Sequence, residues 1–205
     1  PVAAHLVREF GRKLPELAAV ESSGPAQVMH RRLSDVPRLT MREAYSLPAP
    51  KSIYERLPYP SRNGGFEKAF MERANADAGV EAFCKVHEHR HDFVRLRYVK
   101  DNGLNGFYSP DFLVRTAGRI WVVETKSQTM LGQADVTRKK RAALAWCERL
   151  NRLPPEERGA VTWSYCLLGE TLFYGFRDKG ASLADTLEFA RVRLAVGEAN
   201  SLLTE

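Results

Sequence analysis

Cysteine is scarce in this sequence of 205 residues: only Cys84, Cys147 and Cys166 occur, far apart and in apolar surroundings. An odd number of scattered cysteines excludes the disulfide framework of a small secreted protein. Reduced thiols in the core of an intracellular, cytoplasmic protein are the expectation instead. The chain also lacks an apolar run long enough to cross a bilayer and any signal-peptide pattern, so we expect no membrane partner.

Repeats and low-complexity tracts are missing as well, which excludes a solenoid and favours one domain with appended segments. The hydrophobic content of 44% is ordinary for a soluble globular protein. Acidic residues are fewer than basic ones, 25 against 31, and the formal charge of +6 suits a polyanionic partner. Because the first residue is Pro1 rather than methionine, we expect the chain to be a piece of a longer protein.

The most informative stretch is Phe107 to Lys126, which predicts two strands joined by a tight turn. Ile120 to Val123 is apolar on both faces, a pattern that indicates a buried central strand. Glu124 and Lys126 follow it, two positions apart, so their side chains point to the same face. A charged pair at the end of a buried strand costs free energy unless it has a role. The alternative is a surface hairpin whose strand ends in a salt bridge.

Asp111 lies on the first of these two predicted strands, directly after Pro110. If the turn contains an even number of residues, so that Arg115 pairs with Ile120, Asp111 comes opposite Glu124 on the same face. Two carboxylates so close repel each other, and a hard divalent cation allows both to stay ionised. The pair therefore predicts a site for Mg²⁺, with Mn²⁺ as a substitute.

Lys126 adds a cation to this patch. Beside a bound metal ion, a lysine can orient the attacking water and stabilise the charge that develops on a phosphate. The expected reaction is hydrolysis of a phosphodiester bond. Pro110-Asp111, followed by Glu124-Thr125-Lys126, resembles the motif of the PD-(D/E)XK nuclease superfamily. In many of these nucleases a glutamate from the helix before the first strand joins the metal site, and the resemblance gives that position to Glu67.

Glu67 belongs to a helix predicted over Phe66 to Ala76, on its apolar side, whereas Glu72 falls on the far side. We therefore expect Glu67 to be a half-buried acid and a third catalytic and metal-binding residue beside Asp111 and Glu124. The alternative is a structural ion pair between Glu67 and an arginine such as Arg95 or Arg97.

A helix predicted over Ala134 to Asn151 follows the strand that ends at Lys126. One face is apolar, and the opposite face is a basic stripe of four arginines: Arg138, Arg141, Arg149 and Arg152. We expect the stripe to follow the phosphates of double-stranded DNA; the alternative is a basic face that only contacts solvent. Lys140 falls inside the apolar sector, and we expect Lys140 or its neighbour Lys139 to reach the carboxylates and to contribute to DNA binding.

The remaining elements are predicted without catalytic or binding residues. A first strand is expected over Phe93 to Val99, from which the turn Asp101 to Gly103 leads into the central hairpin. The histidines of His87 to His91 are interpreted as part of a polar loop, because a zinc site needs ligands from separate segments. Further patterns predict an amphipathic helix (Ala3 to Leu14), an extended connector (Ser46 to Gly65), a strand (Val161 to Leu168), a short strand in a hairpin with it (Leu172 to Phe176), a last helix (Leu183 to about Val196) and a mobile tail after Gly197.

The order helix, three strands, helix, strand over about Phe66 to Leu168 is that of the PD-(D/E)XK core, so the expected fold class is α/β, with a mixed central sheet flanked by helices. A narrower resemblance is carried by Lys51-Ser52-Ile53-Tyr54, Phe66-Glu67, Tyr108 to Phe112, Val123 to Lys126 and Trp146-Cys147. These segments are similar to the C-terminal endonuclease region of the restriction subunit of type III restriction enzymes.

That resemblance implies cleavage of double-stranded DNA, a superfamily 2 helicase motor in the same polypeptide, and a methyltransferase subunit that reads the sequence as partner. No Gly-x-x-x-x-Gly-Lys loop occurs, so the motor would lie upstream of Pro1. Residues 1–60 are then an N-terminal segment and connector, and residues 61–205 the nuclease domain. Two other classes remain open: a catalytically degenerate domain that only binds DNA, and a hydrolase of another phosphate ester.

Overall fold

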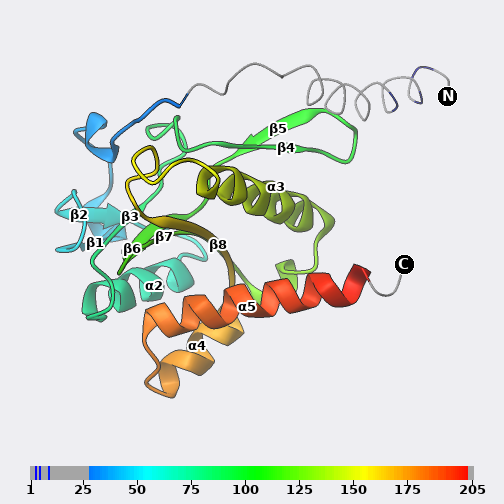
Figure 1. The fold of residues 1–205 in the computed structure, drawn as a ribbon. Helices are drawn as coiled ribbons and strands as arrows, with labels where there is room; N and C mark the ends of the chain where they lie inside the picture. Colours follow the sequence, from blue (N-terminus) through cyan, green and yellow to red (C-terminus); the bar gives the residue numbers. More distant parts are fainter. Residues whose placement is uncertain (1–2, 4, 6–8, 10–27, 203–205) are drawn as a thin grey trace.

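The computed structural model describes residues 28–202 and the isolated positions 3, 5 and 9, with side chains described up to residue 193. Helices cover both faces of a four-stranded mixed sheet, so the predicted mixed α/β class is confirmed (Figure 1). The helix predicted over Ala3 to Leu14 lies, apart from those isolated positions, outside the described residues.

The central sheet runs in the order β3–β6–β7–β8. Its strands are β3 (Ala82–Lys85), β6 (Phe112–Thr116), β7 (Arg119–Lys126) and β8 (Thr162–Gly169). β6 is antiparallel to both β3 and β7, whereas β7 and β8 are parallel. Parallel neighbours need a crossover connection, which α3 (Ala134–Asn151) provides. The predicted bounds of α3 are confirmed, and β8 begins and ends one residue after its prediction.

The turn between β6 and β7 sets the register of the site. Arg115 pairs with Ile120 and Thr116 with Arg119, so the turn contains two residues, an even number, which is the condition for Asp111 to come opposite Glu124. Gly118 in this turn has a φ of +67°, which residues with a side chain rarely adopt. The tight turn therefore fixes which residues of β6 and β7 share a face.

The prediction of the first strand is wrong. Residues 96–99 of the predicted Phe93–Val99 strand form β4 (Leu96–Val99), which pairs with β5 (Asn105–Tyr108) in a separate two-stranded hairpin. The turn at Asp101–Gly103 closes this hairpin instead of leading into the central one. β3 takes the first place in the central sheet, and its four residues show no alternating pattern from which it could be predicted.

Two predictions near the C-terminus are also corrected. The segment predicted as a strand over Leu172–Phe176 belongs to a helix, α4 (Glu170–Asp178), because its apolar residues recur at helical spacing and Phe173 packs against Phe66 and Phe70. The last helix, α5 (Leu183–Leu202), continues beyond the predicted end near Val196, and the tail predicted to be mobile after Gly197 is helical up to Leu202. At its start the Asp185 amide donates to Ser182 Oγ at 3.0 Å, so the Ser182 side chain caps the helix.

Two hydrophobic cores lie on opposite faces of the sheet (Figure 1). One face packs against α2 (Gly65–Ala76), α4 and α5, with Phe70, Phe112 and Leu187 fully buried. The other packs against α3 and the β4–β5 hairpin, through Val122, Tyr165 and Ala143 among others. Because strand residues alternate between the faces, Glu124 and Lys126 lie on the α3 face together with Val122.

Residues before α2 also contribute to the first core. The predicted connector Ser46–Gly65 contains a small hairpin of β1 (Ser46–Pro48) and β2 (Arg56–Pro58), and Leu57 is fully buried. Upstream of it lie short 3₁₀ turns, Leu33–Asp35 and Glu43–Tyr45. The boundary predicted near residue 60 stays a prediction, although side chains from both sides of it meet in one core.

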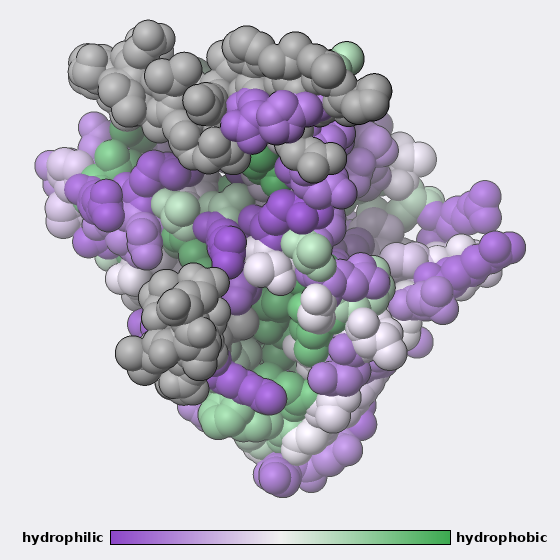
Figure 2. Space-filling model, turned by 90° about the vertical axis from the view of Figure 1, so that its right-hand side faces the viewer, coloured by the Kyte–Doolittle hydropathy of each residue, from purple (hydrophilic) through white to green (hydrophobic). Residues whose placement is uncertain are grey.

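None of the helices that the structure describes combines the length and apolar character of a membrane span. Figure 2 shows that hydrophilic residues cover much of the face at the right of Figure 1, while a hydrophobic area lies at about the height of α5. Helix α5 also carries the exposed side chains of Phe189 and Val192.

Candidate active site

Asp111, Glu124 and Lys126 meet where β7 ends. Asp111 lies in a bend directly before β6, not on a strand as predicted, and the pairing of Phe112 with Val123 places it next to Glu124. Asp111 Oδ2 accepts hydrogen bonds from the Thr125 amide and from Thr125 Oγ1, both at 2.7 Å. Glu124 Oε1 forms an ion pair with Lys126 Nζ. The predicted patch of two carboxylates and one lysine is thus present in the structure.

The two sheet neighbours of β7 explain why Glu124 is buried. Strands β6 and β8 flank β7 on either side, and Glu124 is only 6% exposed. Asp111 is half-buried, and its backbone oxygen accepts a hydrogen bond of 2.9 Å from the Val86 amide, which continues the β3–β6 pairing one residue beyond the end of β3 and before the start of β6. The backbone on both sides of the site is therefore held by the sheet.

The environment of Glu124 disfavours its charged form. Burial, and secondly the nearby charge of Asp111, raise the pKa of the Glu124 carboxyl to about 7, although Lys126 and Lys139 act in the opposite direction. Glu124 Oε2 is buried and has no hydrogen-bond partner within the part of the chain that the structure describes. A buried carboxylate oxygen without a partner is costly, so this atom is suited to receive a ligand.

Lys126 is held in its charged form. Burial by itself would lower the pKa of Lys126, but the surrounding carboxylates of Glu124, Asp111 and Glu67 outweigh it and raise the pKa above its usual value. Lys126 Nζ also lies 3.1 Å from the backbone oxygen of Thr125, to which it donates. The ammonium group is therefore a fixed positive charge beside both carboxylates.

Glu67 is half-buried on α2 and Glu72 is exposed, as predicted. The Glu67 carboxylate forms an ion pair with Lys85, the last residue of β3. The alternative partners Arg95 and Arg97 are therefore wrong: the ion pair that the structure records for Glu67 is with Lys85. Lys85 Nζ lies 5.2 Å from the centre of the Phe112 ring, on the α2 face of the sheet. Glu67 acts on Lys126 through its charge, while its carboxylate is engaged on the opposite face.

The donor set fits Mg²⁺ through two carboxylates. Among the described residues, no group of three or more His, Cys, Asp or Glu side chains is arranged to hold a metal ion. Mg²⁺ is commonly held by only one or two carboxylates and otherwise by water and substrate phosphates. Asp111 and Glu124, with the unpartnered Oε2, meet that requirement. Glu67 would join them only by leaving Lys85.

His91, the last histidine of the segment His87 to His91, has a structural role. His91 is fully buried, its Nδ1 accepts a hydrogen bond from the His87 amide at 3.0 Å, and its Nε2 lies 2.9 Å from the Tyr54 hydroxyl. Tyr54 in turn donates to the Val36 oxygen at 2.7 Å. Both ring nitrogens of His91 are thus engaged in joining the loop to the N-terminal part of the structure.

Of the two lysines expected near the carboxylates, Lys139 is the one whose charge acts on Glu124. Lys139 Nζ pairs with Asp135 Oδ2 at 2.7 Å and lies 5.4 Å from the ring centre of Tyr98 and 5.8 Å from that of Tyr108. Lys140 instead lines a hollow of about 650 Å³ beyond the end of β8, together with residues of α4 and α5.

The basic stripe of α3 is mostly accessible. Arg141, Arg149 and Arg152 are exposed, whereas Arg138 is half-buried and lies 3.7 Å from Asp135. Three of the four arginines can therefore reach an external polyanion without any change in the packing of the protein interior.

Two tyrosines near the carboxylates were not predicted. Tyr108 donates from its hydroxyl to the Lys139 backbone oxygen at 3.0 Å, and burial together with the charge of Glu124 raises its pKa. Burial raises the pKa of Tyr165 as well, and the charges of Tyr108 and Glu124 add to the effect. Tyr108 lies three residues before Asp111, a proximity that could have suggested a role. Tyr165 joins the site only through the parallel pairing of β7 with β8, which a single sequence does not reveal.

Chemically, the site combines two carboxylates that can share a hard cation with a lysine that stays protonated beside them. None of the protein-family models, curated proteins or solved structures with which the chain was compared matches it.

Proposed function

We propose that this chain is a metal-dependent endonuclease domain that hydrolyses phosphodiester bonds in double-stranded DNA. The fold supports the proposal, because α2, β3, β6, β7, α3 and β8 follow one another in the order expected of a PD-(D/E)XK core. The β4–β5 hairpin is an insertion between the first two strands of that core.

The observation that carries the proposal is the meeting of Asp111, Glu124 and Lys126 at the end of a buried strand. A structural salt bridge would not need a second carboxylate beside Glu124, since two such charges in one place destabilise the fold. It also would not leave Glu124 Oε2 buried and without a partner among the described residues. Both features are explained if the site receives a cation.

Each residue then has a distinct role. Asp111 and Glu124 would hold Mg²⁺ or Mn²⁺, which when bound activates water and neutralises charge on the phosphate. Thr125 orients Asp111 through two hydrogen bonds, so that the second oxygen of Asp111 remains for the ligand. Lys126 keeps its proton and stabilises the negative charge that grows on the phosphate during the reaction.

DNA is the proposed substrate because the chain is basic and the exposed arginines of α3 follow the site in sequence. On the resemblance to type III restriction enzymes, a helicase motor would lie in the same polypeptide and a methyltransferase subunit would be the partner.

Cleavage of plasmid DNA tests the proposal. We expect the chain, or the longer protein that contains it, to nick or cut plasmid in Mg²⁺ or Mn²⁺ and to stop in excess EDTA. Asp111→Asn removes a metal ligand and should lower the rate by several orders of magnitude. The matched control is Asp178→Asn, an aspartate with 63% of its side chain exposed on α4. Cutting in EDTA, or equal rates for the two variants, would refute the metal mechanism.

One observation favours a second candidate, a degenerate domain that binds DNA without cutting it. Glu67 is engaged by Lys85, and no three-ligand metal group is found in the described part of the chain. In that case the wild type should bind duplex DNA in Mg²⁺ and leave it intact at any enzyme concentration. The same plasmid assay, combined with a binding measurement, separates the two candidates.

A further inference from the structure

The β4–β5 hairpin has one buried face and one exposed face. Tyr98 and Tyr108 are buried, with their rings edge to face at 5.8 Å, and Lys139 of α3 lies over both. Arg97 and Phe107 alternate with them and are exposed. The packing of the buried face against α3 holds the hairpin in place and fixes the direction of its outer face.

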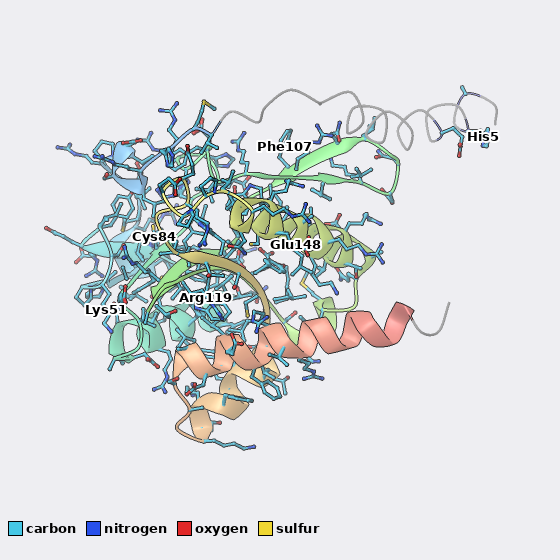
Figure 3. All side chains as sticks on the ribbon, in the orientation of Figure 1. His5, Lys51, Cys84, Phe107, Arg119 and Glu148 are labelled. Atoms are coloured by element: carbon cyan, nitrogen blue, oxygen red, sulfur yellow. The ribbon has the colours of Figure 1, made fainter. Side chains whose placement is uncertain are left out.

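Aromatic and aliphatic side chains gather on the exposed parts of this hairpin. Phe107 is 64% exposed, Leu104 in the turn is 52% exposed and Val99 is 36% exposed. Figure 3 labels Phe107 on β5, above α3 in that view. A single exposed apolar residue needs no explanation, but three on one short hairpin indicate a contact surface.

The same hairpin is positively charged. Arg95, Arg97 and Lys100 are exposed, against Asp101 as the single acidic residue between positions 95 and 108. Arg97 stands directly opposite Phe107 across the two strands. An aromatic ring beside a guanidinium group suits a nucleic acid, because the ring contacts bases while the cation binds phosphate.

The position of Phe107 relative to the candidate active site limits where such a contact falls on DNA. Phe107 precedes Asp111 by four positions. A fully extended chain spans at most about 14 Å over four residues, which corresponds to roughly four base pairs at about 3.4 Å per pair.

We propose that the outer face of the β4–β5 hairpin binds duplex DNA within a few base pairs of the cut, with Phe107 against the bases and Arg97 on a phosphate. The position of the cut rests on the proposed nuclease function, whereas the binding itself does not. The hairpin would thus place the scissile phosphate relative to Asp111 and Glu124, as a positioning element.

Binding of a fluorescent duplex of random sequence, measured by anisotropy in Ca²⁺ at several salt concentrations, tests the assignment. We expect Phe107→Ala to weaken affinity by roughly 5- to 100-fold at every salt concentration, without a change in slope, because base contacts are not ionic. Arg97→Gln should instead lower the slope of log affinity against log salt by about one unit. Phe107→Trp should retain the affinity, since the ring is kept.

Two control variants share the chemistry but lie elsewhere. Phe189→Ala removes a phenylalanine of 47% exposure from α5, and Arg177→Gln removes an exposed arginine from the last turn of α4. Neither should change affinity or slope. Unchanged far-UV circular dichroism and melting temperature for Phe107→Ala would exclude loss of folding as the cause.

A set of duplexes, each with 2-aminopurine at a different position, shows where on the DNA the hairpin binds. With the wild type, fluorescence should rise at positions within about four base pairs of the mapped cut, and Phe107→Ala should abolish the rise. Wild-type affinity and slope for Phe107→Ala and Arg97→Gln would overturn the inference, and would leave the hairpin as a surface for a protein. Failure of the wild type to bind DNA would overturn it too. If binding depends on Phe107 but no DNA is ever cut, only the proposed nuclease function fails.

Discussion

As the pH rises from acid to alkaline values, the wild type should lose more unfolding free energy than the Glu124→Gln variant loses. Burial and the charge of Asp111 raise the pKa of Glu124 from 4.5 to about 7 in the folded state. A carboxyl whose pKa is raised by folding stabilises the fold while it is protonated, and this contribution is lost as the pH rises through the folded pKa. Glutamine has nearly the same shape and stays neutral at every pH.

The magnitude follows from the pKa difference. For a shift of this size, the wild type should lose roughly 2 to 3 kcal/mol of unfolding free energy between about pH 5 and pH 8 that Glu124→Gln does not lose. For a chain of this length that corresponds to roughly 5 to 10 °C in melting temperature. Glu124 is only 6% exposed, so solvent screening does not reduce the expected effect strongly.

The assay is urea unfolding of both proteins in EDTA at several pH values, followed by circular dichroism. Glu148→Gln, a change at an exposed glutamate of α3 that Figure 3 labels, is the matched control and should give a curve parallel to that of the wild type. If the unfolding free energy of Glu124→Gln also changes with pH in parallel with that of the wild type, folding does not disfavour the charged form of Glu124. Added Mn²⁺ should reduce the disadvantage of the wild type at pH 8, because the cation stabilises the charged carboxylate.

Three further predictions concern the lysine, the basic stripe and the histidine loop. Lys126→Arg should cut DNA poorly, because the larger guanidinium does not fit the place of the lysine ammonium. Lys126→Ala should still bind Mn²⁺ in calorimetry, and loss of that binding in a folded variant would mean that Lys126 has a structural role. Alanine in place of all four stripe arginines should lower the salt slope of DNA affinity by about three units, fewer than four because Arg138 is half-buried; an unchanged slope would mean that the stripe only contacts solvent. Burial, together with the charges of His87 and Arg90, lowers the pKa of His91. The unfolding free energy of the wild type should therefore fall as the pH drops below about 6.5. His91→Asn should show a smaller fall in urea titrations, and an equal fall for both proteins would contradict this.

Much of the candidate site could be predicted from local patterns. The apolar run Ile120–Val123 predicts the central strand, and the alternation of side chains puts Glu124 and Lys126 on one face; both depend only on neighbouring residues. The even turn with Gly118 brings Asp111 opposite Glu124 for the same reason. Helix α3 was predicted with its correct bounds because its periodic pattern is long.

The errors arose where a short segment could adopt either structure. β3 has only four residues, and α4 is rich in aromatic side chains that also favour strands. In both cases a distant element decides: β3 pairs with β6, and Phe173 of α4 is buried against Phe66 and Phe70 of α2.

The sequence by itself determined which groups meet in the site, because Glu124 and Lys126 stand on β7, Asp111 directly precedes β6, and a local turn sets the register of the two strands. Only the tertiary structure decided what surrounds them. The pairing of Glu67 with Lys85, the approach of Lys139 rather than Lys140, and the two buried tyrosines all depend on contacts between elements far apart in the chain. The separation of the β4–β5 hairpin from the central sheet is of the same kind, since strand partners are chosen by how side chains fill the space between layers.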